Sequence, residues 1–503
     1  MGVDRTSKVA SKIQIIGALS VIWLLAIVFM HFVRPIILPP VLNLGVEKDE
    51  VLIYGPWGNE RRFTEEGQPN REELEKEEGE EDVWSYNDSC KFVLVESIPQ
   101  DLPYISARSA AQPLIQSWME LLDSAQDSVH IASYYWSLTG PDIGVNDSSS
   151  QPGEELLGKL ETLLARNVSL TIATSDPTLA VNSTDLEVLM GKGAQVRKVP
   201  MKHLTHGVLH SKFWIVDMKH VYLGSANMDW RSLTQVKELG VVIYNCSSLA
   251  SDLEKTFQTY WVLGVPGATI PKHWPQNYST NINWHHPLQE TLDGMVTTAY
   301  FSASPPTFCP RGRTKDLEAL LSVIRGAEDF LYASVMEYFP TSRFEHPIRY
   351  WPVIDNALRE VAFNRHVLIH LLISCGKNSD PSMFPYLRSL QALTNPQTNI
   401  TIEVKIFIIP VGNHSNIPYS RVSHSKYAVT EKKVYLGTSN WSEDYFTNTA
   451  GVGLVINQRS SDPQHPAPTI QDNLKSIFER DWQSPYAISL DKLPGQQDCA
   501  WHA

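Results

Sequence analysis

The chain has 503 residues, 43% of them apolar and 19% charged, and a formal net charge of −13 at pH 7. This length accommodates two ordinary domains or one large duplicated domain, and the composition is that of a folded globular protein. The acidic balance excludes a broad basic coat of the kind that binds duplex nucleic acid through counterion release. It does not exclude a phosphate-bearing substrate, because residues 47–82 alone hold 14 acidic and 5 basic residues, a net charge of −9.

The first predicted element is a transmembrane signal anchor at residues 13–33, preceded by a cytosolic tail of residues 1–12. The anchor has 21 residues, which span roughly 31 Å as a helix and are enough to cross a bilayer. Arg5, Lys8 and Lys12 precede it, which places the N-terminus in the cytosol and the rest of the chain in the lumen. The alternative is a cleaved signal peptide, but the apolar run is long for one and no small-residue cleavage site follows it.

Residues 34–83 are predicted to form an exposed acidic lumenal stalk, because prolines and a Glu-rich run oppose regular structure there. A lumenal location predicts N-glycosylation, and nine N-x-[ST] triplets follow the anchor. Eight of them are predicted acceptors: Asn87, Asn146, Asn167, Asn182, Asn245, Asn277, Asn399 and Asn413. The ninth, at Asn440, lies inside a motif described below, and we expect it to be unmodified.

The five cysteines show no metal-binding spacing. In an oxidising lumen, two disulfides and one free thiol are the simplest arrangement. We expect the pairs Cys90–Cys246 and Cys375–Cys499, one in each half of the chain, although the sequence alone does not fix the pairing.

From residue 84 onward the chain shows an internal duplication. Amphipathic helices are followed by short apolar strands in both halves, and a third strand ends at a proline before the motif described below. In the first half the expected elements are helices 110–124 and 154–166 and strands 127–134, 168–173 and 195–200; in the second they are helices 315–326 and 354–363 and strands 329–335, 367–373 and 404–410. The pattern predicts an α/β fold with mixed sheets covered on both faces. We expect two pseudo-symmetric α/β/α halves, residues 84–290 and 291–503, with one active site at their interface.

Each half carries the same short motif, a His-Ser-Lys triplet followed by Val-Tyr-Leu-Gly-[ST]-x-Asn. Its residues are His210, Lys212 and Asn227 in the first copy and His424, Lys426 and Asn440 in the second. A single His-Ser-Lys triplet is a weak signal, and a lone histidine or lysine in such a strand is usually structural. Two copies at the same place in a repeat strongly favour a function.

These side chains suit the cleavage of a phosphodiester. Residues i and i+2 of a strand point to the same side, so we expect each histidine to project beside its lysine. Lysine and asparagine can hold the non-bridging oxygens. One histidine can attack phosphorus to give a phosphohistidine, and the other can protonate the leaving oxygen and then activate water. One imidazole must be neutral and the other protonated, which a mildly acidic compartment allows because free imidazole titrates near pH ~6.5. No metal and no other cofactor is required.

Three carboxylates accompany the motif. Asp217 and Glu431 follow the His-x-Lys pairs at the same spacing, and a salt bridge within each half explains them as well as a direct role in catalysis does. Glu238 follows the first motif, and we place Thr449 at the equivalent position of the second copy. A carboxylate at this position therefore orients at most one of the two histidines.

The paired motifs resemble the H-x-K-x4-D…G-S-x-N signature of the phospholipase D superfamily, and the duplication that carries them covers nearly all of residues 84–503. With the predicted anchor and the segment of residues 206–240, the chain is similar to the lysosomal, type II membrane branch of that superfamily. It departs from the family pattern at Glu431, where Asp is usual, and by one fewer residue before Gly437. Both departures put a strict requirement for the second acidic position in doubt, and neither affects the His-Lys pairs.

The resemblance implies a 5′-to-3′ exonuclease that degrades single-stranded DNA and RNA and limits nucleic-acid sensing by innate immune receptors. It implies passage through the endoplasmic reticulum and Golgi to endolysosomes. It also assigns the nucleophile and acid roles to His210 and His424, and phosphate binding to Lys212, Lys426 and the two asparagines. Family habit favours the first histidine as the nucleophile.

The residues by themselves leave the substrate open between two classes. A nuclease would add aromatic platforms for bases, and the candidates after the first strand of each half are Tyr134, Tyr135, Trp136, Tyr338 and Phe339. A lipid hydrolase or transphosphatidylase acting on glycerophospholipids would use the same catalytic groups. A receptor ectodomain on an inactive scaffold is disfavoured because both His-Lys pairs are intact. The expected partners are a single-stranded nucleic acid and the membrane; a phospholipid substrate and a homodimer stay open.

Overall fold

The computed structural model describes residues 89–102, 110–292, 295–460 and 467–501. The predicted cytosolic tail, anchor and stalk, and Asn87, lie outside these ranges. Within them, no helix has the length and apolarity needed to cross a membrane. Residues Trp84–Ala503 belong to one unit, so the two predicted halves are parts of the same body.

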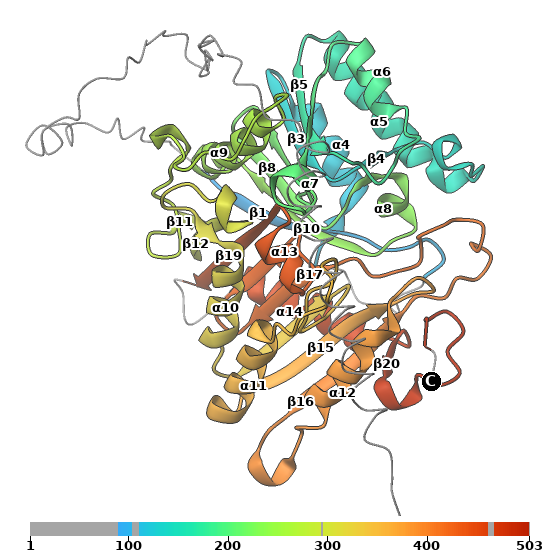
Figure 1. The fold of residues 1–503 in the computed structure, drawn as a ribbon, viewed down its shortest axis with the longest axis vertical. Helices are drawn as coiled ribbons and strands as arrows, with labels where there is room; N and C mark the ends of the chain where they lie inside the picture. The colour runs from blue at the N-terminus through green and yellow to red at the C-terminus, as the bar shows by residue number, and fades with distance from the viewer. Residues whose placement is uncertain (1–88, 103–109, 293–294, 461–466, 502–503) are drawn as a thin grey trace, which may run out of the picture. The chain divides into compact units, whose positions relative to one another are not determined.

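In the described residues, the first half is built on an eight-stranded mixed sheet with the order β2-β1-β10-β8-β7-β3-β5-β6 (Figure 1). Its strands are β1 (Lys91–Ser97), β2 (Gln112–Pro113), β3 (Ser128–Ser133), β5 (Ser169–Ser175), β6 (Gln195–Val199), β7 (Phe213–Val216), β8 (His220–Gly224) and β10 (Glu238–Tyr244); β4 (Trp136–Ser137) and β9 (Met228–Asp229) pair separately. β3, β5 and β6 are parallel, and β7, β8 and β10 continue the sheet antiparallel.

The second half repeats this arrangement on a ten-stranded sheet with the path β11-β12-β19-β18-β17-β14-β15-β16-β20 and β13 paired to β12. Its strands are β11 (Leu288–Leu292), β12 (Met295–Ser304), β13 (Thr314–Lys315), β14 (Phe330–Val335), β15 (Leu368–Cys375), β16 (Ile402–Ile408), β17 (Lys426–Thr430), β18 (Val434–Gly437), β19 (Gly451–Ser460) and β20 (Ala487–Ser489). The run β12-β19-β18-β17-β14-β15-β16 matches β1-β10-β8-β7-β3-β5-β6 strand for strand. The predicted duplication and mixed α/β class are therefore confirmed.

The expected boundary at residue 290 needs an adjustment. It falls inside β11, which forms an antiparallel hairpin with β12 and so belongs to the second sheet. The second half therefore begins at Leu288 in structural terms. The dipeptide Asp293-Gly294 is typical of hairpin turns, and the expected boundary did not take it into account.

Helices cover both faces of each sheet (Figure 1). They are α4 (Leu114–Ser124), α5 (Gln151–Ala165), α6 (Asp185–Gly191), α7 (Met201–Leu204), α8 (Trp230–Thr234) and α9 (Ser247–Leu263) in the first half, and α10 (Asp316–Gly326), α11 (Val353–Arg365), α12 (Phe384–Gln391), α13 (Glu443–Thr447) and α14 (Ile470–Gln483) in the second. α4 and α5 pack with one face of the first sheet, and α10, α11 and α12 with one face of the second. α9 and α14 pack on the opposite faces.

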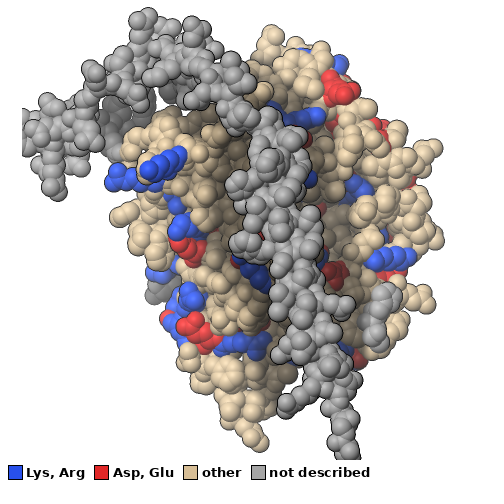
Figure 2. All heavy atoms as spheres, in the orientation of Figure 1, with Lys and Arg blue, Asp and Glu red and all other residues tan. Residues whose placement is uncertain are grey.

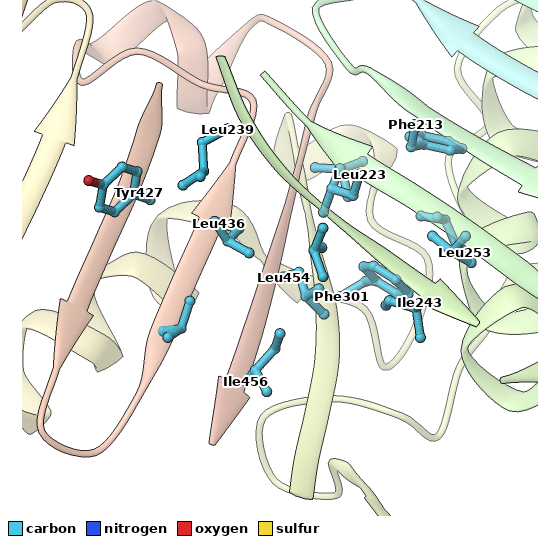
Figure 3. Packing of buried hydrophobic residues seen from close by; sticks show 14 of the residues in the cluster. Phe213, Leu223, Leu239, Ile243, Leu253, Phe301, Tyr427, Leu436, Leu454 and Ile456 are labelled. Carbon is cyan, nitrogen blue, oxygen red and sulfur yellow. The ribbon is translucent and has the colours of Figure 1, made fainter. Parts of the chain in front are cut away.

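The two halves share one apolar core between their sheets. A single cluster contains buried side chains from both, including Phe213, Leu223 and Ile243 of the first half and Leu436 and Leu454 of the second (Figure 3). Fully burying one such side chain contributes about 1.5–3 kcal/mol. Because this core takes one face from each sheet, neither half can bury its apolar surface without the other.

Both predicted disulfides are present. Cys90 is bonded to Cys246 with a Cα–Cα distance of 4.5 Å, and Cys375 to Cys499 with 5.1 Å. Each bond closes a loop within one half. The thiol of Cys309 donates to the Ala303 carbonyl at 3.2 Å, and burial raises its pKa to about 12, which keeps it in the unreactive protonated form.

Candidate active site

The two His-x-Lys motifs lie at the start of equivalent central strands, not inside them. β7 begins at Phe213 and β17 at Lys426, so both histidines precede their strands. Each is instead held by the main chain of the other half. The amide of His210 donates to Ala450 at 2.8 Å, and the amide of His424 donates to the Lys237 carbonyl at 2.7 Å. Docking of the two halves therefore fixes the position of both histidines.

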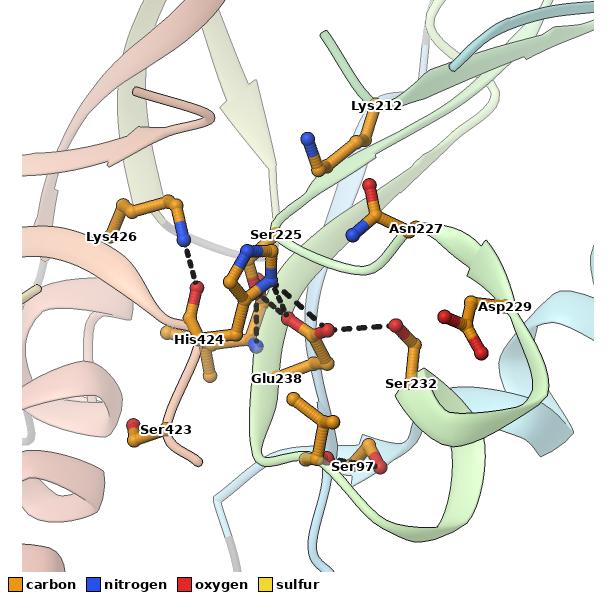
Figure 4. Close-up of polar contacts among 12 residues, drawn as sticks. Ser97, Lys212, Ser225, Asn227, Asp229, Ser232, Glu238, Ser423, His424 and Lys426 are labelled. Atoms are coloured by element: carbon orange, nitrogen blue, oxygen red, sulfur yellow. Dashed lines mark hydrogen bonds and ion pairs between the residues drawn. The ribbon is translucent and has the colours of Figure 1, made fainter. Parts of the chain in front are cut away.

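The motifs meet in one buried site. The ring centroids of His210 and His424 are 6.5 Å apart with an interplanar angle of 73°, and the two side chains belong to residues that are only 6% and 9% exposed. The Nζ atom of Lys212 donates to the His210 carbonyl at 2.7 Å. That of Lys426 donates to the His424 carbonyl at 2.6 Å, as Figure 4 shows. Each ammonium has three donors, so both lysines keep N–H groups for an anion.

Burial lowers the pKa values of these four groups, and repulsion from neighbouring cations adds to the effect on both histidines and on Lys212. Burial lowers the pKa of His210 well below its ordinary value, and the charges of Lys212 and Lys426 add to this effect. Burial and the charge of Lys426 likewise lower the pKa of Lys212 well below its ordinary value. The pKa of Lys426 falls to about 7 through burial, opposed by Glu238 and Glu337. A bound phosphate would relieve this repulsion, which makes the site an anion receptor.

Glu238 makes His424 different from His210. The Nδ1 atom of His424 donates to the Glu238 carboxylate at 3.0 and 3.2 Å. The same carboxylate accepts from the hydroxyls of Ser225 at 2.6 Å and Ser232 at 2.8 Å (Figure 4). Burial, with the charges of the two lysines, keeps the pKa of His424 below its ordinary value, and Glu238 opposes this fall. Burial opposes ionisation of Glu238, yet His424 and Lys426 hold its pKa below the ordinary value. The dyad thus supports a protonated imidazole.

No carboxylate of the described residues pairs with His210. Its Nδ1 atom donates to the Thr438 carbonyl at 2.9 Å, which leaves the Nε2 lone pair free. Pairing of β8 with β10 and of β18 with β19 makes Gly240 equivalent to Gly453 and hence Glu238 equivalent to Gly451. The predicted equivalence with Thr449 was therefore wrong by two residues. A Cβ atom at Gly451 would lie 2.5 Å from Ser439 Oγ, so no side chain fits there.

Asn227 and Asn440 lie at the site, as predicted, but in unequal surroundings. The Nδ2 atom of Asn227 lies 3.4 Å from the Tyr135 hydroxyl, and that of Asn440 lies 3.2 Å from the Tyr445 hydroxyl and 3.4 Å from Glu337. Both Oδ1 atoms are buried and accept no hydrogen bond within the described residues. Unpaired amide groups at a site are expected where a substrate supplies the missing partner.

Asp217 and Glu431 do not face the site. They lie beyond the far ends of β7 and β17, and each carboxylate accepts main-chain amides at the start of the neighbouring strand. Asp217 accepts from residues 126–128 at 2.8–2.9 Å, and Glu431 from residues 328–330 at 2.9–3.4 Å. Both predicted explanations, a salt bridge and direct catalysis, are replaced by a structural role that anchors β3 and β14.

Most of the predicted aromatic platforms are core residues. Tyr135, Trp136, Tyr338 and Phe339 are all at least nine-tenths buried. Tyr134 is the exception, because its ring centroid lies 5.2 Å from that of His210 and 5.7 Å from Lys212 Nζ.

Two further site residues were missed by sequence reasoning. The Tyr445 ring lies 5.1 Å from that of His210, and the Glu337 carboxylate lies beside Asn440. Burial raises the pKa of Glu337. Neither residue belongs to the repeated motif: Glu337 takes the place of Tyr135 in the other half, so comparison of the two copies was the only signal that could have found it.

The face of the molecule drawn in Figure 2 is not broadly basic where its described residues are seen. On the face shown in Figure 2, Lys and Arg side chains are interspersed with Asp and Glu and separated by uncharged surface. Within the site, Lys212 and Lys426 supply positive charge to a substrate. Among the described residues, no three His, Cys, Asp or Glu side chains are grouped so as to hold a metal ion.

Comparison with known proteins agrees with this geometry. The family described as "PLD3/4, PLD-like domain" matches residues 107–412. The chain is 60% identical to the human protein named 5′-3′ exonuclease PLD4, over 98% of this chain and 94% of that one. It is 64% identical to the mouse 5′-3′ exonuclease PLD4 over 84% of each chain, and 50% identical to the Xenopus laevis 5′-3′ exonuclease PLD3 over 81% of this chain and 82% of that one. The chain therefore belongs to the PLD3/4 family of phospholipase D-like proteins.

Proposed function

We propose that this protein is a phosphodiesterase that acts as a 5′-to-3′ exonuclease on single-stranded DNA and RNA. The observation that carries the proposal is the meeting of His210–Lys212 and His424–Lys426 across the interface of the two halves, 6.5 Å apart at the imidazole rings. Nucleic acid is proposed as the substrate because the chain is 60% identical to the human 5′-3′ exonuclease PLD4 over nearly its whole length.

In the first step the scissile phosphate binds between the two lysines. Their free N–H groups donate to the non-bridging oxygens, and Asn227 and Asn440 lie beside them. Because these donors are preorganised and shielded from water, they stabilise the negative charge that grows on phosphorus in the transition state. Tyr134 packs against His210 and Lys212 at the same place.

His210 is the proposed nucleophile. Its Nδ1 hydrogen bond to the Thr438 carbonyl leaves Nε2 unprotonated, and its lowered pKa keeps the imidazole neutral. Nε2 attacks phosphorus and forms a P–N bond as the bond to the leaving oxygen breaks.

His424 is the proposed acid and then the base. Glu238 stabilises its protonated form, so His424 gives its proton to the leaving oxygen as that bond breaks. In the second step the neutral His424 takes a proton from water, the water oxygen bonds to phosphorus, and the P–N bond to His210 breaks. Both histidines return to their starting states.

The test uses the full-length chain at about pH 5 with a 5′-labelled single-stranded oligonucleotide and, separately, with phosphatidylcholine or phosphatidylglycerol vesicles. We expect stepwise release of mononucleotides from the labelled end, abolished by His210→Ala and by His424→Ala. An intact oligonucleotide beside cleaved lipid would overturn the proposal in favour of the lipid hydrolase or transphosphatidylase.

We further propose that the catalytic unit works in the lumen of endolysosomes, tethered by residues 13–33, where it limits nucleic-acid sensing by innate receptors. Two disulfides suit an oxidising compartment, and six of the described acceptor asparagines are exposed while Asn245 is partly exposed. Asn440 is 3% exposed, too buried to be modified. Removal of N-glycans should lower the apparent mass, and the protein should stay with membranes after an alkaline carbonate wash. Loss of the protein into the wash would contradict the tether.

A further inference from the structure

A cluster of four charged side chains is buried between the halves behind His424. Lys237 Nζ lies 2.8 Å from the Asp481 carboxylate and 3.7 Å from that of Glu96. Arg480 donates to both oxygens of Glu96 at 2.6 and 2.7 Å and to Asp481 at 2.9 Å. All four side chains are between 1% and 9% exposed.

The cluster joins elements of both halves. Glu96 belongs to β1 and Lys237 directly precedes β10, whereas Arg480 and Asp481 belong to α14. Among the described residues, the cluster pairs two positive with two negative side chains. A buried, paired cluster of this kind tolerates little displacement, because moving one charge leaves the others buried and uncompensated.

The main chain at Lys237 is part of the active site. Its amide donates to Val422 at 3.0 Å, and its carbonyl accepts from the amide of His424 at 2.7 Å. The next residue, Glu238, accepts from His424 Nδ1. Two consecutive residues thus hold both the main chain and the ring of His424, and the side chain of the first is fixed to α14 by Asp481.

The equivalent corner of the other half is uncharged. Leu209 and Ser423, the residues before the two histidines, make equivalent bridges, Leu209 to Ala450 and Ser423 to Lys237. Ala450 therefore takes the place of Lys237 in the other half. The neighbouring contact is between hydroxyls, with Ser211 Oγ 2.9 Å from Tyr260 Oη. The charged cluster therefore accompanies only the histidine that has a carboxylate partner.

We infer that the Lys237–Asp481 ion pair is a positioning device for the His424–Glu238 dyad. It holds the start of β10 against the second half, so that Glu238 stays within hydrogen-bond distance of Nδ1. Lys237 touches no substrate and is a positioning residue, and its role rests on the proposed phosphodiesterase function.

The test compares two buried ion pairs in the full-length chain. The double variant Lys237→Met with Asp481→Leu removes the pair without leaving an orphaned charge, and Glu96 and Arg480 still neutralise each other. The matched control is Arg313→Met with Asp252→Leu, which removes a second pair across the halves, 2.6 Å long and 1–2% exposed. Arg313 and Asp252 have no contact with either histidine among the interactions of the described residues.

We expect the melting temperature to fall in both double variants. Only the Lys237 double variant should lower kcat, by about tenfold or more, while its KM stays within about twofold. The alkaline limb of its pH–rate profile should move to lower pH, because a looser Glu238 contact stabilises the protonated His424 less. Lys237→Arg, which keeps the charge, should recover part of kcat. Wild-type kcat and pH profile in the Lys237 double variant would overturn the inference.

A second variant and a second substrate keep the test decisive. If the Lys237 double variant does not fold, Asp481→Asn is measured in the same way, because Lys237 then keeps Glu96 as a partner; an unchanged pH profile there counts against the inference. The chromogenic diester bis(4-nitrophenyl) phosphate is run beside the oligonucleotide. Wild-type cleavage of this diester without oligonucleotide cleavage would remove the exonuclease proposal and leave the positioning test intact.

Discussion

The corner around His210 and the corner around His424 descend from the same strand order but are chemically unequal. His424 donates to a buried carboxylate that two serine hydroxyls support. His210 donates to a main-chain carbonyl and lies beside the rings of Tyr134 and Tyr445. A duplicated site can thus divide one reaction between two copies of the same residue: the copy with a carboxylate holds a proton, and the copy without one keeps a free lone pair.

The largest expected effect is the loss of either histidine. His210→Asn and His424→Asn should each lower mononucleotide release by about 10³-fold or more. With a substrate that has a good leaving group, the two variants should differ in whether the phosphohistidine intermediate accumulates. His424→Asn should trap a phosphohistidine at residue 210, because attack still occurs while water activation is lost. His210→Asn should trap none. Label found on His424 after acid-free digestion would reverse the assignment of the two corners.

The next largest effect is expected for Glu238→Gln. Since Glu238 raises the pKa of His424, its loss should lower kcat by about 10- to 100-fold and move the alkaline limb of the rate profile to lower pH. Ser232→Ala removes one of the two hydroxyls on Glu238 and should cause a smaller change in the same direction. An unshifted pH profile in Glu238→Gln would mean that the carboxylate only fills space.

A third effect concerns Lys426, whose pKa of about 7 follows from burial opposed by Glu238 and Glu337. Below pH 7 the ammonium is charged and holds phosphate; above it the charge is lost. KM for the oligonucleotide should therefore rise steadily from pH 6 to pH 8, with the midpoint near the pKa. The Lys426→Arg variant should bind the oligonucleotide more weakly, because a guanidinium holds phosphate in a different geometry from an ammonium. Its KM should not change with pH in this range. A flat wild-type KM across the range would contradict the expected charge loss.

Sequence reasoning predicted the parts of this molecule that repeat. The helix–strand pairs and the meeting of four catalytic candidates follow from patterns that are local or present twice; the two disulfides were expected as one pair in each half, a pairing that the sequence alone does not fix. The parts that it missed are those where the copies differ. Glu238 was expected to orient at most one histidine, but its choice of His424 and the role of Lys237 depend on contacts across the halves, which no spacing along the chain specifies.

Two kinds of mistake show the same limit. The predicted equivalence of Thr449 with Glu238 is wrong because the sequence alone does not reveal that β18 and β19 keep the register of β8 and β10. Asp217 was grouped with the site because it follows His210 at a family spacing, whereas the strand between them carries it to the opposite end. Register and strand direction are tertiary properties, set by packing and not by composition.

The smallest expected effects compare Asp217 with Glu431. Asp217 accepts three main-chain amides at 2.8–2.9 Å and Glu431 accepts three at 2.9–3.4 Å, so the first is the tighter anchor. Asp217→Asn should lower the free energy of unfolding by about 2 kcal/mol and Glu431→Gln by about 1 kcal/mol, in line with hydrogen bonds to charged groups. Neither should change kcat at a temperature where the variant is folded. A fall in kcat at an unchanged melting temperature would instead show that these carboxylates act in catalysis and do not only anchor a strand.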